Sequence, residues 1–149
     1  MISIGRLEPE DRAEWEALFR GYNAFYGRPS PDQEMIDRAW REFQADDRMH
    51  ALGARLDGQL DGQLVGITHF FVHVSTTSPD VCYLQDLFTA PEARGHGVGR
   101  ALIQAVADWA RERDCVRVYW HTHDSNETAR RLYDKVAVNR GFIEYNLQL

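Results

Sequence analysis

A glycine-rich turn before a helical pattern is the first feature of the sequence that could do chemistry. Residues 94–99 read Arg-Gly-His-Gly-Val-Gly, so three of the eleven glycines fall within five positions. The start of a helix carries unpaired backbone N–H groups and a partial positive charge, and glycine lets a phosphate approach them without a Cβ in the way. Arg94 and Arg100 would add cations beside the turn. The turn therefore predicts a phosphate or pyrophosphate site, with a flexible loop before an ordinary helix as the alternative.

Two common nucleotide-binding patterns are absent from this turn. No Lys-Ser or Lys-Thr pair follows its last glycine, as a P-loop kinase requires. The six-residue dinucleotide spacing is also missing, and the helix comes late in the chain rather than after the first strand. These two observations exclude the kinase and dinucleotide-binding interpretations.

A second group of candidate residues lies on the last predicted helix. Asn126, Ala129 and Tyr133 are spaced i, i+3 and i+7, so they share one helical face. Ala129 is small enough for a ligand to approach. Leu132 and Val136 lie beside this face and should point into the core. We therefore expect Tyr133 at the border between core and cleft, where its phenol could donate a proton, with a core tyrosine whose hydroxyl reaches water as the alternative.

The elements that position these residues follow from hydrophobic periodicity and turn residues. Ser30, followed by Pro31 and Gln33, is the predicted N-cap of the second helix. The tetrapeptide Asp-Gly-Gln-Leu at 57–60 and 61–64 predicts a hairpin turn. Strands are predicted over 2–7, 49–56, 64–75, 81–89, 116–122 and 142–149, and helices over 9–25, 31–43, 98–113 and 127–138. No linker divides this β-α-α-β-β-β-α-β-α-β order, which predicts one α/β domain over residues 1–149.

Composition narrows the class of protein. The chain has 149 residues, of which 44% are hydrophobic and 27% charged, enough for one domain with its own core. Its net charge of -6 argues against a nucleic-acid partner and suits a cationic substrate. Cys82 and Cys115 lack the spacing of a metal site. Without a signal-peptide pattern or a long apolar run, we expect a cytoplasmic protein that does not enter a membrane.

In combination, these motifs resemble those of the GNAT N-acetyltransferases. The matching positions are Arg94, Gly97 and Gly99 in the turn, residues 84–89 in the strand before it, and Asn126, Ala129, Tyr133, Gly141 and Phe142 after it. The element order along the whole chain also matches. The resemblance implies the single-domain GNAT fold, a mixed central sheet in the order given above with helices on both of its faces.

The resemblance also implies a cofactor, acetyl-CoA, lying between the strand that ends at Thr89 and the strand over 116–122. The backbone of Leu87 and Thr89 would pair with the pantetheine arm, and no metal would be required. A tyrosine at the position of Tyr133 acts in this family as the general acid that protonates the departing thiolate. The implied cofactor-binding residues are Leu87, Phe88, Thr89, Arg94, Gly95, His96, Gly97, Val98, Gly99, Arg100, Asn126, Ala129 and Tyr133.

The general base is harder to assign. The polyamine- and histone-type branch of the family usually has Tyr-Leu-Glu-Asp where this chain has Tyr-Leu-Gln-Asp at 83–86. Gln85 cannot usefully accept a proton, although it could hydrogen-bond the substrate. Asp86 could be a base, a cation anchor or a structural carboxylate, and it shares a face with Gln85 only if a bulge interrupts the strand. His121 and His123 could act through water or form a metal pair, with surface histidines as the alternative.

The acceptor side of the reaction rests on aromatic residues of the first two helices. Tyr26, at the break between them, is the expected substrate-binding residue, through apolar or cation–π contact, with core packing as the alternative. We expect acetyl transfer to a primary amine of a small molecule, such as a polyamine or an amino acid. The alternatives are a protein lysine or N-terminus, or a non-catalytic acyl-CoA-binding regulatory domain. The last strand and the open sheet edges could support a homodimer.

Overall fold

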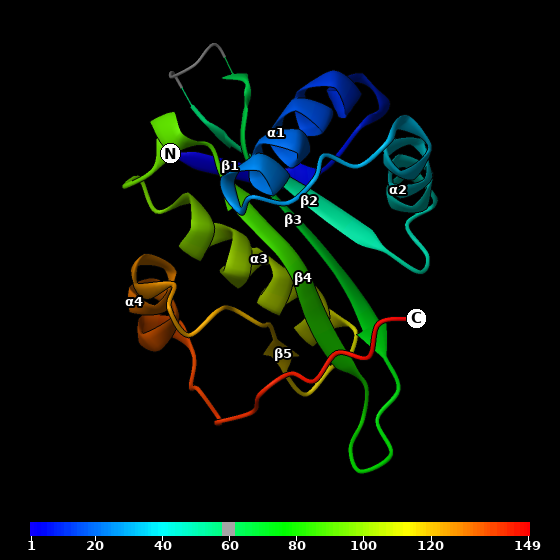
Figure 1. Ribbon diagram of the computed structural model, residues 1–149, viewed down its shortest axis with the longest axis vertical. Helices are drawn as coiled ribbons and strands as arrows, with labels where there is room; N and C mark the ends of the chain where they lie inside the picture. The colour runs from blue at the N-terminus through cyan, green and yellow to red at the C-terminus, as the bar shows by residue number, and fades with distance from the viewer. Residues whose placement is uncertain (58–61) are drawn as a thin grey trace.

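The computed structural model describes residues 1–57 and 62–149, which fold around a five-stranded mixed sheet with helices on both faces (Figure 1). Its strands lie side by side in chain order, antiparallel except for the last pair, which is parallel. They are β1 (Ile2–Arg6), β2 (His50–Leu56), β3 (Leu64–His73), β4 (Val81–Thr89) and β5 (Val118–Tyr119). The predicted α/β fold is confirmed.

The helices α1 (Arg12–Phe25) and α2 (Gln33–Ala45) cover one face of this sheet. A short 3-10 turn over Pro9–Asp11 leads into α1, and the Glu8 amide donates to the Asp11 carboxylate there over 2.8 Å. The apolar stripe of α1 includes Trp15 and Tyr22, seven residues apart and both buried. Their rings pack over β3 and β4, Trp15 beside His69 and Tyr22 beside Phe88.

The N-cap of α2 is not the residue that the sequence predicted. Asp32 caps this helix, because its Oδ1 accepts a hydrogen bond from the Met35 amide over 2.9 Å. The hydroxyl of Ser30 accepts instead from the Arg20 guanidinium over 2.6 Å. The predicted cap at Ser30 was therefore wrong by two residues, since a carboxylate three residues before Met35 was available to the helix.

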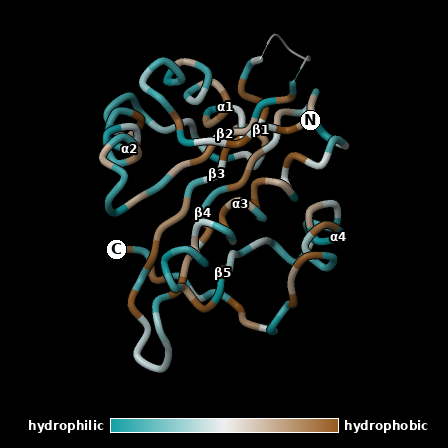
Figure 2. The backbone as a smooth tube through the Cα atoms, turned by 180° about the vertical axis from the view of Figure 1, so that it is seen from behind, coloured by the Kyte–Doolittle hydropathy of each residue, from teal (hydrophilic) through white to brown (hydrophobic). Residues whose placement is uncertain are grey.

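The opposite face of the sheet carries α3 (Val98–Glu112) and α4 (Glu127–Val136). Figure 2 shows the hydrophobic stretches along the central strands and α3. Gly66 on β3 lets α3 approach closely, since a Cβ there would lie 2.6 Å from Val98 Cγ1. No residue of α4 is fully buried, and Leu132, Tyr133 and Val136 hold it against the core from a partly buried position.

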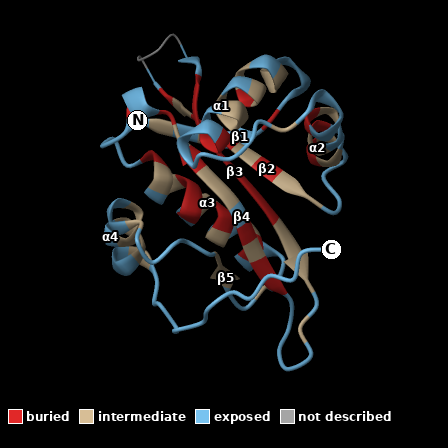
Figure 3. Cartoon of the chain, viewed as in Figure 1, coloured by how far each residue is buried: buried red, intermediate tan, exposed pale blue. Residues whose placement is uncertain are grey.

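Two predicted strands differ from the structure near the carboxyl end. The strand predicted over 116–122 pairs with β4 only at Val118–Tyr119. The segment 142–149 forms no strand and is exposed along its whole length (Figure 3). Glu144 Oε2 lies 3.2 Å from His121 Nδ1, but the backbone around Glu144 does not pair with a strand. A strand needs a paired neighbour for its backbone groups, and β5 is too short to provide one.

The predicted hairpin turn at the repeated tetrapeptide includes residues 58–61, which lie outside the described residues. The strands on either side of it, β2 and β3, are antiparallel neighbours from His50↔Phe70 to Arg55↔Leu64. Within the part of the chain that the structure describes, no helix has both the length and the apolar character needed to span a membrane.

Candidate active site

The parallel strands β4 and β5 diverge and leave an open edge along the second half of β4. They pair only at Cys82↔Val118 and Tyr83↔Tyr119, whereas β4 continues to Thr89. The Ala90 amide donates to Val65 of β3 over 2.8 Å. Because backbone groups alternate between the two edges of a strand, those of residues 87 and 89 point to the open edge. These are the backbone groups that the resemblance assigns to the pantetheine arm.

Phe88, between them, has a packing role in the structure. Its backbone is paired with Ile67 on β3, and its side chain is buried with ring centroids 5.7 Å from Tyr22 and 6.4 Å from Phe25. The Arg94 guanidinium lies 4.5 Å from the Phe25 centroid, a cation–π contact that fixes a positive charge beside the end of α1. Phe88 therefore supports the open edge without facing it, and Arg94 is held near it.

The backbone of the glycine turn has the shape of an anion cradle. Gly95 and Gly97 have φ angles of +83° and +80°, and an added Cβ at either would meet nothing within 4 Å. Gly97 is the N-cap of α3, no side chain caps the helix, and its first turn holds no acidic residue. The first helical hydrogen bond runs from the Ala101 amide to Gly97, so the amides of residues 98–100 remain available. This backbone fits a pyrophosphate.

Neighbouring side chains fix this turn in place. The ring of His96 donates from Nδ1 toward the carbonyls of Ala93 and Arg94, at 3.1 and 3.2 Å. Val98 is buried in the core and anchors the start of α3. A Cβ on Gly99 would lie 3.4 Å from Leu132 Cδ2, so this glycine allows α4 to pack against the start of α3. The exposed Arg100 adds a positive charge on the first turn.

Replacing Gly97 with Ala should weaken acetyl-CoA binding by about tenfold or more, because a hydrogen bond to a charged group contributes about 1.5–3 kcal/mol. The new Cβ would stand where the phosphates approach. Isothermal titration of the variant with acetyl-CoA measures the effect. Gly62→Ala is the matched control, since Gly62 has a φ of +75° and equally open surroundings but lies far along the chain from the turn. Equal affinity losses in both variants would argue against the cradle.

Asn126 joins the cofactor side to the acceptor side. Its Oδ1 caps α4 by accepting from the Ala129 amide over 3.4 Å, and its Nδ2 donates to the Tyr26 hydroxyl over 3.4 Å. Tyr26 stands at the end of α1, so the contact brings α1 and α4 together across the opening of the sheet. Two residues predicted for different halves of the reaction are thus neighbours.

Tyr133 lies next to this pair. Its ring packs edge-on against Trp120 with centroids 5.3 Å apart, and its hydroxyl forms no hydrogen bond with any residue of the described part of the chain. Burial, with a smaller effect of Tyr26, raises the pKa of Tyr133 to about 12. The phenol therefore keeps its proton at neutral pH, as a proton donor must.

A bulge at Gln85 interrupts the pairing of β4 with β3 just before Asp86. His69 on β3 is opposite Asp86, and the next residue, Phe70, is already opposite Leu84, so Gln85 has no partner. Leu84 consequently packs on the α3 side, whereas Asp86 faces α1. The bulge considered as one alternative in the sequence is confirmed, and Gln85 itself is exposed beside the carboxylate.

Asp86 is mostly buried but surrounded by groups that favour its charged form. Burial alone would raise the pKa of its carboxyl. Burial is the largest single effect, but the contact with His69, at 2.9 Å between Nδ1 and Oδ2, and the smaller effects of Tyr22 and Arg28 together outweigh it, so the pKa of Asp86 is lowered. Burial of the Tyr22 phenol and, to a smaller extent, the negative charge of Asp86 raise the pKa of Tyr22. Asp86 is therefore a carboxylate at neutral pH.

The sequence interpretation missed two residues of this site, His69 and Arg28. His69 is 1% exposed in the apolar run of β3, and a lone imidazole in such a run was the available signal. The Arg28 guanidinium lies 4.5 Å from the Tyr22 centroid and 5.3 Å from that of Tyr26. No spacing in the sequence connects either residue to Asp86, which is reached only across the sheet or from the loop after α1.

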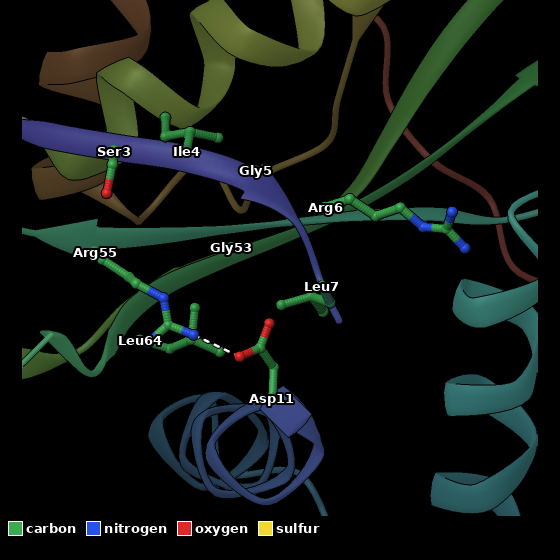
Figure 4. A pocket seen from close by; sticks show the side chains of 9 residues that line it. All are labelled: Ser3, Ile4, Gly5, Arg6, Leu7, Asp11, Gly53, Arg55 and Leu64. Atoms are coloured by element: carbon green, nitrogen blue, oxygen red, sulfur yellow. Dashed lines mark hydrogen bonds and ion pairs between the residues drawn. The ribbon is translucent and has the colours of Figure 1, made fainter. Parts of the chain in front are cut away.

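The other candidates lie apart from this arrangement. His121 contacts Tyr83 and Glu144, His123 is exposed, and no group of three metal-ligating side chains gathers among the described residues. A hollow of about 250 Å³ lies at the β1–β2 end of the sheet (Figure 4). Arg55 and Asp11, which both line this hollow, form an ion pair at 2.5 Å, so these two charges are already paired with each other. The candidate residues that lie close to one another are thus those at the β4–β5 opening.

Comparison with known proteins identifies the family of the chain. The Acetyltransferase (GNAT) family model matches residues 15–137. The D-amino-acid N-acetyltransferase HPA3 of Saccharomyces cerevisiae is 31% identical over 145 residues, covering 97% of this chain and 89% of that protein. The uncharacterized N-acetyltransferase YhfO of Bacillus subtilis is 27% identical over 151 residues, covering 99% of this chain and 98% of that protein.

Solved structures show the same fold. A ribosomal-protein-alanine N-acetyltransferase from Brucella melitensis biovar Abortus 2308 has a TM-score of 0.81 at 25% identity, with both chains covered completely. AAC(6')-Iy, in complex with the bisubstrate analog CoA-S-monomethyl-acetylneamine, has a TM-score of 0.83 at 17% identity, covering 100% of this chain and 99% of that one. The chain therefore belongs to the GNAT family and is an acetyl-CoA-dependent N-acetyltransferase that acts on amines.

Proposed function

We propose that this enzyme transfers the acetyl group of acetyl-CoA directly to the primary amine of a small molecule, and that amino acids are preferred to polyamines. The observation that carries the proposal is the pair of opposite charges at the acceptor side, the Asp86 carboxylate and the Arg28 guanidinium. An amino acid carries an ammonium and a carboxylate close together, which matches one anion and one cation. A polyamine carries only cations and would meet the positive charge of Arg28.

The contacts of Arg28 support this choice. Its guanidinium lies against the rings of Tyr22 and Tyr26, and the latter touches Asn126 on the cofactor side. The guanidinium is also close enough to Asp86 to lower the pKa of that carboxyl. Arg28 itself is exposed, so a ligand carboxylate can reach it. The relative from Saccharomyces cerevisiae, a D-amino-acid N-acetyltransferase by name, agrees with an amino-acid acceptor.

The roles of the residues follow from their chemistry. Acetyl-CoA supplies an activated acetyl thioester at the β4–β5 opening, where the turn over 95–100 would hold its pyrophosphate. Asp86 holds the ammonium of the acceptor and orients its nitrogen. A carboxylate with a lowered pKa is a weak base, so the proton of the ammonium passes on to water. Tyr133 holds the proton that the departing sulfur needs.

Release of free thiol from acetyl-CoA, measured with a panel of D- and L-amino acids, diamines and aminoglycosides, tests the proposal. Amino acids should give the highest kcat/KM. Arg28→Gln should raise the KM for the best amino acid by about tenfold, through loss of a charged hydrogen bond, and should leave or lower the KM for a diamine.

The matched control for this variant is Arg38→Gln, which removes an exposed guanidinium on α2 and should leave both KM values unchanged. Diamines turned over better than every amino acid by the unmodified enzyme would overturn the preference. Acetylation of none of the amines in the panel would overturn the proposed function as a whole.

A further inference from the structure

The imidazole of His69 is buried against aromatic side chains of α1 and α2. Its ring stacks on Phe43 with centroids 4.3 Å apart and an interplanar angle of 22°. Phe19 meets it edge-on, at 5.4 Å and 68°. Only 1% of the residue is exposed, and Trp15 beside it is fully buried. The orientation of this ring is therefore set by packing, and its two nitrogens face fixed partners.

Those partners determine which nitrogen carries the proton. Trp15 Nε1 lies 2.9 Å from His69 Nε2, and an indole N–H can only donate. Nε2 must therefore offer a lone pair. Nδ1 lies 2.9 Å from Oδ2 of Asp86, and a carboxylate can only accept. Nδ1 must therefore carry the hydrogen. The two contacts together select the neutral tautomer protonated at Nδ1.

A second proton on His69 would disrupt these two hydrogen bonds. A second proton would have to sit on Nε2, where it would face the N–H of Trp15 with no acceptor between them. The charged groups nearby are Asp86 on β4 and Arg28 in the loop after α1, and Tyr22 on α1 can also titrate. Phe43 from α2 and Ala51, opposite His69 on β2, carry no charge. Among the described residues around the ring, Asp86 alone carries a charge that would compensate a positive imidazole.

We infer that His69 is a positioning residue, held neutral by the indole of Trp15, that fixes the Asp86 carboxylate toward the acceptor and keeps its negative charge uncancelled. An ammonium acceptor would otherwise compete with an imidazolium ion for the same carboxylate. The role of Asp86 in holding the acceptor comes from the proposed function, and this inference rests on it. The tautomer of His69 follows from the two hydrogen bonds alone.

Replacing Trp15 with Phe tests the inference, because it removes the donor to Nε2 and leaves an aromatic ring in place. In this variant no donor to Nε2 selects the tautomer of His69, so Asp86 loses its fixed hydrogen bond and the KM for the amine should rise by about tenfold at neutral pH. The KM for acetyl-CoA should stay the same.

Trp40→Phe is the matched control. Trp40 belongs to the same buried cluster, with its ring centroid 5.1 Å from that of Trp15, but it is not hydrogen-bonded to His69. Both variants lose the same volume from the aromatic core, so general loosening should affect them alike. A rise in the KM for the amine in Trp40→Phe equal to that in Trp15→Phe, or a rise in neither, would overturn the inference.

Long-range proton–nitrogen NMR of the imidazole gives a readout that does not depend on activity or on a variant. His69 of the unmodified protein should show a hydrogen on Nδ1 and none on Nε2 at neutral pH. A hydrogen on Nε2 would contradict the inference. If no amine is acetylated, the proposed function fails, while this spectrum still decides the state of His69.

Discussion

Replacing Tyr133 with Phe lowers turnover by about a hundredfold or more, the effect expected when a positioned proton donor is lost, and leaves the KM for acetyl-CoA nearly unchanged. The hydroxyl makes no hydrogen bond within the described part of the chain, so its removal breaks no structural contact there. The ring remains packed against Trp120. Steady-state kinetics with the best amine of the panel give both constants.

The pH profile adds a second check on Tyr133. Its pKa is raised to about 12, so the hydroxyl keeps its proton throughout the neutral range and loses it only as the pH approaches that value. Loss of activity at mildly alkaline pH should therefore not come from this residue. Tyr145→Phe removes the same atom from an exposed tyrosine and should change neither constant. An equal loss of turnover and cofactor affinity in Tyr133→Phe would mean that the residue is structural.

Asp86→Asn is expected to lower kcat/KM for the amine by about a hundredfold, chiefly through KM, because a charged hydrogen bond contributes about 1.5–3 kcal/mol and the ion pair is lost with it. The amide has the shape of the carboxylate and can still accept the hydrogen bond from His69, so the variant isolates the charge. The KM for acetyl-CoA should stay the same. Asp134→Asn, an exposed change on α4, is the control.

The sign of the pKa shift makes a further expectation for Asp86. A lowered pKa keeps the carboxyl ionised at every pH above its ordinary value of 3.8, and the charge is lost only when the pH falls below that. Binding of the amine by the unmodified enzyme should thus not weaken between about pH 8 and pH 5 through Asp86. A fall in kcat with an unchanged KM in Asp86→Asn would make this residue the base instead of the anchor.

The predicted cofactor half of the site depends on local sequence. The turn over 94–99 and the spacing from Asn126 to Tyr133 each lie within one loop or one helix, where a few residues decide the backbone shape. The open edge at residues 87 and 89 agrees with that prediction. Phe88 differs, because the pairing of β3 with β4 decides which residues face the edge.

The acceptor half could not be predicted because it is assembled from distant segments. Asp86 meets His69 across two strands, and Trp15 reaches His69 from a helix 54 residues earlier. Arg28 depends on the path of the loop after α1. The terminal segment 142–149 has the alternation of a strand but finds no paired neighbour in the described structure, since alternation states a preference and pairing depends on the rest of the sheet.

The bulge on β4 can also be understood as an insertion. With Gln85 removed, Leu84 and Asp86 would be adjacent and would still point to opposite faces, so every neighbouring side chain would keep its present direction. The extra residue therefore does not serve to aim Asp86. What it adds is a bend, at the place where β4 leaves β5 and opens the sheet. Exchanging Gln85 would alter one surface side chain, whereas deleting it would straighten the strand and narrow the opening.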